Sequence, residues 1–62
     1  MNGIKRLREA AGIKQWELAN AVGVDRSTIS KWEIGVQFPR TDKLTLIAKV
    51  LKCTVDQLLE SA

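Results

Sequence analysis

The sequence predicts an all-α fold, with five short helices in a single domain that covers residues 1–62. Apolar residues recur three and four positions apart in five segments, which is the spacing of one helix face. Glycines and one proline separate several of these segments, and no segment alternates apolar and polar residues as a strand does. A chain of 62 residues buries one small core, so a deep catalytic cleft is not expected.

Each of the first two predicted helices is followed by a glycine. The first covers about residues 2–11, and Gly12 is its C-terminal stop. Its apolar face is formed by Ile4, Leu7 and Ala11. The second helix covers about residues 15–22, and Gly23 can take the left-handed conformation that ends it in a sharp turn. Its apolar face is formed by Leu18, Ala19 and Val22.

The third predicted helix begins after Asp25, a good N-cap because its carboxylate can accept the free amides of the first turn. Gly35 ends this helix at about residue 34. Its apolar face is formed by Ile29 and Trp32. The one long loop follows, and within it Pro39 favours an extended connection because it removes an amide donor.

Threonines introduce the last two predicted helices. Thr41 is the expected N-cap of the fourth, whose apolar face is formed by Leu44, Ile47, Ala48 and Leu51. Thr54 is the expected N-cap of the fifth, whose apolar side is formed by Val55, Leu58 and Leu59.

Composition excludes several classes of function. With one cysteine and no histidine, the chain has neither a disulfide nor an evident metal site, and we expect no cofactor, small-molecule ligand or catalytic site. No apolar run is long enough to span a membrane and the N-terminus lacks a signal peptide, so a cytoplasmic protein is expected. Residues 1–40 hold seven Lys/Arg against four Asp/Glu, whereas residues 41–62 hold three of each. The excess positive charge therefore lies in residues 1–40, the part of the chain that contains the second and third helices, and it favours a polyanionic partner.

These two helices follow the pattern of a helix-turn-helix. Ala19 permits a close helix crossing, Gly23 supplies the turn, and Ile29 and Trp32 anchor the second helix of the pair. A helix that reads a DNA major groove needs polar residues near its N-terminal end to reach the base edges. This requirement is met by Arg26, Ser27, Thr28 and Lys31.

Nearly the whole chain resembles the Cro/repressor-type helix-turn-helix family, also called the XRE family. The matching positions are Arg8, Gly12, Gln15, Leu18-Ala19, Gly23-Val24, Ser27 to Glu33, Gly35, Val55-Asp56 and Leu58-Leu59. The resemblance implies a lambda-repressor-like domain of five helices, in which the second and third form the DNA-binding motif. It also implies that Arg26 and Lys31 donate to guanine edges, and that Ser27 and Thr28 contact bases or phosphates.

The resemblance further implies contacts to the DNA backbone and one structural ion pair. The expected phosphate contacts are Lys14, Gln15 and Arg40. Trp16 stands where relatives often have a small residue, and three roles remain open for it: a DNA contact, packing on the helix surface or a protein interface. Arg8 and Glu33 are expected to pair and to fix the first helix against the third.

Two residues differ from the family pattern near the end of the fourth helix. Lys52 occupies the usual place of a glycine, so a tight or strained turn is expected there, and Cys53 is expected to be a buried structural thiol. Relatives of this size bind DNA as dimers. The candidate dimer residues, shared between core and interface, are Phe38, Val55, Leu58 and Leu59.

The predicted function is sequence-specific binding of double-stranded DNA by a transcriptional regulator, acting as a repressor and as a homodimer on a palindromic operator. An antitoxin of a toxin-antitoxin pair and the DNA-binding fragment of a longer regulator are alternatives within the same class. A protein-interaction module that has lost DNA binding is the alternative from another class, and an enzyme is not expected.

Overall fold

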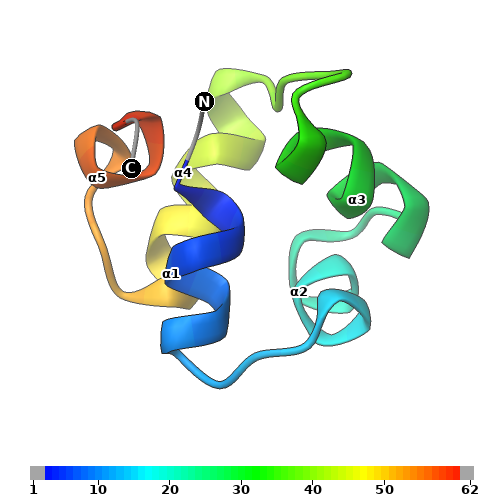
Figure 1. The fold of residues 1–62 in the computed structure, drawn as a ribbon, viewed down its shortest axis with the longest axis horizontal. Helices are drawn as coiled ribbons and strands as arrows, with labels where there is room; N and C mark the ends of the chain where they lie inside the picture. The colour runs from blue at the N-terminus through cyan, green and yellow to red at the C-terminus, as the bar shows by residue number, and fades with distance from the viewer. Residues whose placement is uncertain (1–2, 61–62) are drawn as a thin grey trace.

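The computed structural model describes residues 3–60 and confirms the all-α prediction, since no strand occurs within that range. The helices are α1 (Ile4–Ala10), α2 (Gln15–Val22), α3 (Arg26–Ile34), α4 (Thr41–Leu51) and α5 (Val55–Leu59). Figure 1 shows α2 and α3 together on one side of the molecule and α5 on the opposite side, with α1 and α4 between them. None of the helices within residues 3–60 is long and apolar enough to cross a membrane.

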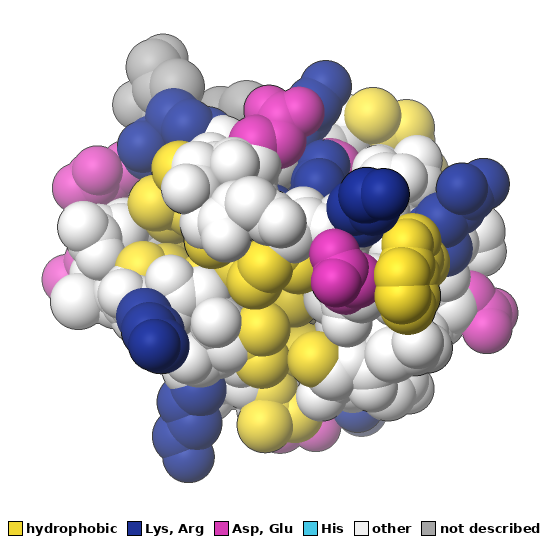
Figure 2. All heavy atoms as spheres, turned by 90° about the horizontal axis from the view of Figure 1, so that it is seen from below, with side chains coloured by type: hydrophobic (Ala, Val, Ile, Leu, Met, Phe, Trp, Pro, Cys, Tyr) yellow, Lys and Arg dark blue, Asp and Glu magenta, His cyan; other side chains and the backbone are white. Residues whose placement is uncertain are grey.

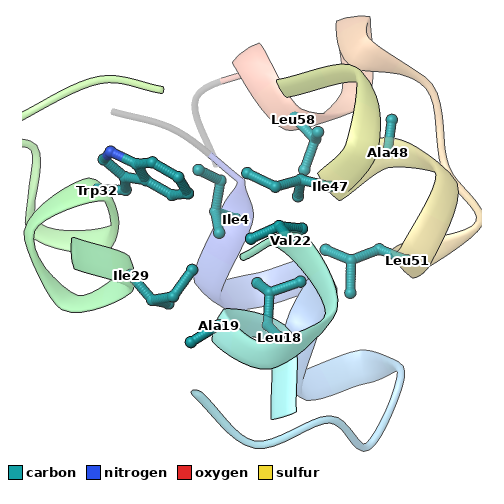
Figure 3. Close-up of a cluster of buried hydrophobic side chains, with 10 residues drawn as sticks. All are labelled: Ile4, Leu18, Ala19, Val22, Ile29, Trp32, Ile47, Ala48, Leu51 and Leu58. Carbon is teal, nitrogen blue, oxygen red and sulfur yellow. The ribbon is translucent and has the colours of Figure 1, made fainter. Parts of the chain in front are cut away.

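All five helices contribute to one hydrophobic core. Its buried members are Ile4, Leu18, Ala19, Val22, Ile29, Trp32, Ile47, Ala48, Leu51 and Leu58. In Figure 3, Ile4, Val22 and Ile47 point toward one another, and Trp32 closes the side toward α3. Burying one Leu or Ile side chain stabilises a fold by about 1.5–3 kcal/mol. The position of α2 and α3 is therefore fixed by the same contacts that hold the domain together.

The start of α1 differs from its predicted position. The helix begins at Ile4, two residues later than expected, and Asn2 lies outside the described residues. Gly3 precedes it, and its amide donates to the carbonyl oxygen of Leu58 at 2.6 Å. A Cβ at Gly3 would lie 2.8 Å from the carbonyl oxygen of Gln57, so the absence of a side chain permits this contact between α1 and α5.

Two of the predicted N-caps are wrong in detail and one is confirmed. Asp25 stands at the N-cap position of α3, but its carboxylate accepts no capping hydrogen bond. Arg40, not Thr41, is the N-cap residue of α4, because Thr41 is already its first helical residue. Thr54 caps α5 as predicted: its hydroxyl accepts the amide of Gln57 at 3.0 Å.

The turn between α4 and α5 contains the expected backbone irregularity. Lys52 has φ 55° and ψ 48°, and it is the one residue other than glycine with a positive φ in the described part of the chain. This left-handed conformation lets the amide of Cys53 donate to the carbonyl oxygen of Ala48 at 3.0 Å. The side chain at position 52 therefore occupies a conformation that glycine adopts without strain.

Candidate nucleic-acid interface

The turn between α2 and α3 holds the two helices in a fixed arrangement. Gly23 is left-handed, with φ 77°, and the amides of Gly23 and Val24 both donate to the carbonyl oxygen of Ala19, at 2.9 and 3.0 Å. Ala19 is 2% exposed, which shows that the helix crossing is closely packed as predicted. Val24 packs against the core, so the turn itself is anchored.

The outer side of α3 carries polar side chains that the fold leaves available. Arg26, Ser27 and Lys31 are exposed and Thr28 is half-buried, whereas Ile29 and Trp32 face the core. None of the four polar side chains has a hydrogen bond or ion pair to another residue in the range 3–60. A guanidinium, an ammonium and two hydroxyls are therefore presented together on one short helix, free to donate to an external acceptor.

The N-terminus of α2 lies near the C-terminal end of α3, where Gln15 Nε2 contacts Glu33 Oε1. The Glu17 carboxylate accepts the amide of Lys14 at 2.8 Å, but the lysine side chain has no acceptor for the first amides of the helix. Lys14 is exposed, and Trp16 is 54% exposed. An N-terminus with unsatisfied amides and a nearby ammonium favours an anion.

Gln15, a predicted phosphate contact, belongs to a hydrogen-bonded network that sequence reasoning did not reveal. Arg8 Nε lies 2.6 Å from Glu33 Oε2 and Arg8 Nη2 lies 3.3 Å from Glu33 Oε1, so the expected ion pair is present. Gln15 Nε2 also donates to Glu33 Oε1, at 2.9 Å. The hydrogen bond from Arg8 to Glu33 raises the pKa of the guanidinium, against the opposing effect of burial.

Arg40 and the four candidate dimer residues lie in different environments. Arg40 is exposed at the end of the loop before α4. Phe38 is 67% exposed, Leu59 is 53% exposed and Val55 is half-buried. Leu58 is 0% exposed: its side chain faces the core, which is one of the two roles expected for it, and the surface of this structure does not present it. Sequence reasoning also missed the exposed apolar residues Ile34 and Val36, which flank the turn after α3.

Charge alone does not mark a DNA-facing surface. Figure 2 shows Lys and Arg side chains scattered over one face, on both sides of a band of hydrophobic side chains in its middle. The net charge of +3 is small. The candidate interface is therefore defined by the geometry of α2 and α3 and by the hydrogen-bonding groups that they present.

Similarity to known proteins agrees with this geometry. A family model described as helix-turn-helix matches residues 4–58. The chain is 38% identical over 56 residues to the HTH-type transcriptional activator BcrR of Enterococcus faecalis; the match covers 90% of this chain but 28% of that protein. The structure resembles that of the P22 c2 repressor in complex with synthetic operator 9T, with a TM-score of 0.86 and 34% sequence identity.

The similarity to the P22 c2 repressor extends over 95% of this chain and 89% of the repressor chain. The residues matched by the family model run from Ile4, the first residue of α1, to Leu58, the residue of α5 that is buried in the core. Fold, motif and sequence thus agree over the same range, and the chain belongs to the XRE-type helix-turn-helix family of DNA-binding transcription regulators.

Proposed function

We propose that this chain binds double-stranded DNA in a sequence-specific manner, with α3 in the major groove. The observation that carries the proposal is the outer side of α3, where four polar side chains that have no partner within residues 3–60 stand on a helix braced by the core. The base contacts are assigned to Arg26, Ser27, Thr28 and Lys31. Arg26 and Lys31 donate to guanine O6 and N7, and the two hydroxyls reach bases or neighbouring phosphates.

Contacts to the sugar-phosphate backbone would set the register of α3 on the duplex. The N-terminus of α2 supplies one group of these contacts, through the first amides of the helix, Lys14 and the side chain of Gln15. Trp16 is exposed next to them and is assigned an additional contact to the backbone. Arg40, exposed at the N-cap position of α4, is assigned a further phosphate contact.

The proposed active form is a homodimer on a palindromic operator. Phe38 and Leu59 support this assignment because each exposes more than half of a large apolar side chain, and Val55 adds a half-buried neighbour on α5. Two copies related by a two-fold axis would place their α3 helices in successive major grooves, about one helical turn apart. Because the proposed ligand is DNA, the protein is assigned to the cytoplasm.

The regulatory consequence that we propose is repression by occupancy of the operator. The structural relative is named a repressor, whereas the BcrR relative is named an activator. A promoter-reporter assay with the operator placed over the promoter separates these possibilities: lower expression supports repression, and higher expression contradicts it. The antitoxin alternative requires a toxin encoded beside the gene, and co-purification with that toxin would favour it.

Selection of binding sites from random duplex DNA tests the central proposal. We expect an enriched palindrome whose half-site centres lie about 10 base pairs apart. Enrichment of single half-sites would contradict the homodimer but not DNA binding. The absence of binding to any duplex, even at low salt, would overturn the proposal and favour the protein-interaction module.

A further inference from the structure

The side-chain amide of Gln15 is held in place by a buried carboxylate. We infer that Glu33 is a positioning residue for the DNA-backbone contact of Gln15, and that Arg8 allows it to take this role by neutralising its charge. The inference rests on the proposed function, since it assigns a cause to the orientation of one proposed contact.

Glu33 is itself fixed by contacts from other parts of the fold. Its side chain is 3% exposed, and Arg8 donates to both of its oxygens from α1. Arg8 is fixed in turn, because its Nη1 donates to the carbonyl oxygen of Ile13 at 2.8 Å. Glu33 Oε1 is therefore a rigid acceptor near the C-terminal end of α3, at 2.9 Å from Gln15 Nε2 at the start of α2.

This acceptor decides which end of the glutamine amide faces the carboxylate. An ionised carboxylate only accepts hydrogen bonds, so the amide nitrogen, and not its oxygen, must point toward Glu33. The nitrogen carries two hydrogens, and one remains for a second acceptor. A phosphate oxygen also only accepts, so a glutamine that contacts phosphate must present this same nitrogen. Glu33 thus selects the amide orientation that suits a phosphate contact before DNA arrives.

Charge explains why Arg8 is needed beside Glu33. A carboxylate near the DNA backbone would repel a phosphate, and the repulsion would be strong in a partly buried setting. Two hydrogen bonds from the Arg8 guanidinium offset the negative charge. The neutral pair therefore orients Gln15 without placing a net negative charge next to the expected phosphate.

A double-mutant cycle on DNA affinity tests the inference. Arg8→Met with Glu33→Leu replaces the pair by apolar groups of similar size, a change that folded proteins often tolerate. Gln15→Ala is then measured in the wild type and in this background, using the selected operator duplex. Because a glutamine ordered in advance loses less freedom on binding, we expect Gln15→Ala to cost three to ten times more affinity in the wild type than in the double variant.

Lys14→Ala is the matched control, since Lys14 has no hydrogen bond to the pair, and it should cost the same in both backgrounds. An equal cost of Gln15→Ala in both backgrounds would overturn the positioning role alone. If Gln15→Ala costs nothing in the wild type, the proposed phosphate contact is wrong as well, and the two failures are thereby distinguished.

A measurement on the wild-type protein without DNA applies even if the double variant does not fold. The side-chain amide of Gln15 should be rigid on the picosecond-to-nanosecond timescale, with an NMR order parameter near that of the backbone. Gln37 is the internal control, because it is exposed and its side chain has no hydrogen bond within residues 3–60. Equal mobility of Gln15 and Gln37 would overturn the inference.

Discussion

Lys43 Nζ donates a hydrogen bond to the carbonyl oxygen of Val22 at 2.8 Å, so α4 caps the C-terminal end of α2. Val22 is the last residue of α2, and its carbonyl has no acceptor role within the helix. The ammonium also interacts favourably with the negative end of the helix dipole. Because Gly23 follows immediately, this contact braces the turn that sets the angle between α2 and α3.

Lys43→Met should lower the free energy of unfolding by about 1 kcal/mol, since it keeps most of the aliphatic stem but removes the charged donor. Urea denaturation monitored by circular dichroism measures the change. Lys5→Met is the control: Lys5 is exposed on α1, and its loss should change stability by less than about 0.5 kcal/mol. Equal effects of the two variants would show that the bond to Val22 contributes nothing.

Breaking the Arg8–Glu33 pair from one side should be more damaging than removing both partners. The two side chains are 9% and 3% exposed, so Arg8→Met leaves Glu33 as a buried charge without its main partner. We expect a loss of about 3–5 kcal/mol for this variant, and a much smaller loss for Arg8→Met with Glu33→Leu. The urea midpoints of the wild type and the two variants show which variant loses more stability. A double variant that is less stable than Arg8→Met alone would contradict this prediction.

Local signals explain which parts of this fold were predictable. Gly23 and Gly35 ended α2 and α3 as expected because a left-handed C-cap depends on the residue itself. The two predicted caps failed for different reasons. Asp25 is at the N-cap position, but its side chain does not adopt a rotamer that accepts a capping hydrogen bond. Thr41 lies one position after the N-cap residue, Arg40. Helix boundaries are thus predictable to within about one or two residues.

Contacts between distant residues were predictable only through the family. Arg8 and Glu33 lie 25 residues apart, and their pairing was implied by the resemblance and not by periodicity. Neither Gln15 with Glu33 nor Lys43 with Val22 was foreseen, because helical spacing identifies a face but not what meets it. For the same reason spacing grouped Leu58 with Leu59, although Leu58 is in the core and Leu59 is exposed.

Lys52→Gly should stabilise the protein. A non-glycine residue in the left-handed region costs about 1–2 kcal/mol, and the extra freedom of glycine in the unfolded chain offsets part of that gain. We expect a net gain of about 1 kcal/mol, which corresponds to a rise in Tm of about 4–8 °C. Lys49→Gly, inside α4, is the matched control and should be destabilising by about 1 kcal/mol. A decrease in the Tm of Lys52→Gly would contradict the strain at this turn.

Cys53 should make stability fall at alkaline pH. Burial raises the pKa of its thiol above the ordinary value of 9.0. Below pH 9.0 both the folded and the unfolded chain hold the proton, and this stabilising contribution is fully present. As the pH rises further, the unfolded chain loses the proton first, so the free energy of unfolding decreases.

The comparison of the wild type with Cys53→Ala isolates this effect from the titration of lysines. Between about pH 8 and pH 10, the wild type should lose more stability than the variant in urea denaturation. The thiol should also react slowly with iodoacetamide in the folded protein and quickly in urea, because the thiolate is the reactive form. Parallel pH profiles of the two proteins would rule out a contribution from Cys53.

Lys31 and Lys14 provide a matched pair for separating base recognition from backbone contact, because both lysines are exposed and neither side chain has a hydrogen bond within residues 3–60. Lys31→Ala should weaken binding to the selected operator by about 1–3 kcal/mol and relax the preference at one base pair per half-site. Lys14→Ala should weaken binding to the operator and to a scrambled duplex alike. It should also reduce the slope of the logarithm of the binding constant against the logarithm of the salt concentration by about one.

Fluorescence anisotropy at several salt concentrations measures both effects, with the operator and the scrambled duplex in parallel. Circular dichroism of each variant verifies that the helices are intact. If Lys31→Ala left the selected base preference unchanged, α3 would contact DNA through its charge alone, and the assignment of Lys31 to a base edge would be wrong. If Lys14→Ala changed the sequence preference instead, base recognition would have to be assigned to the start of α2 and not to α3.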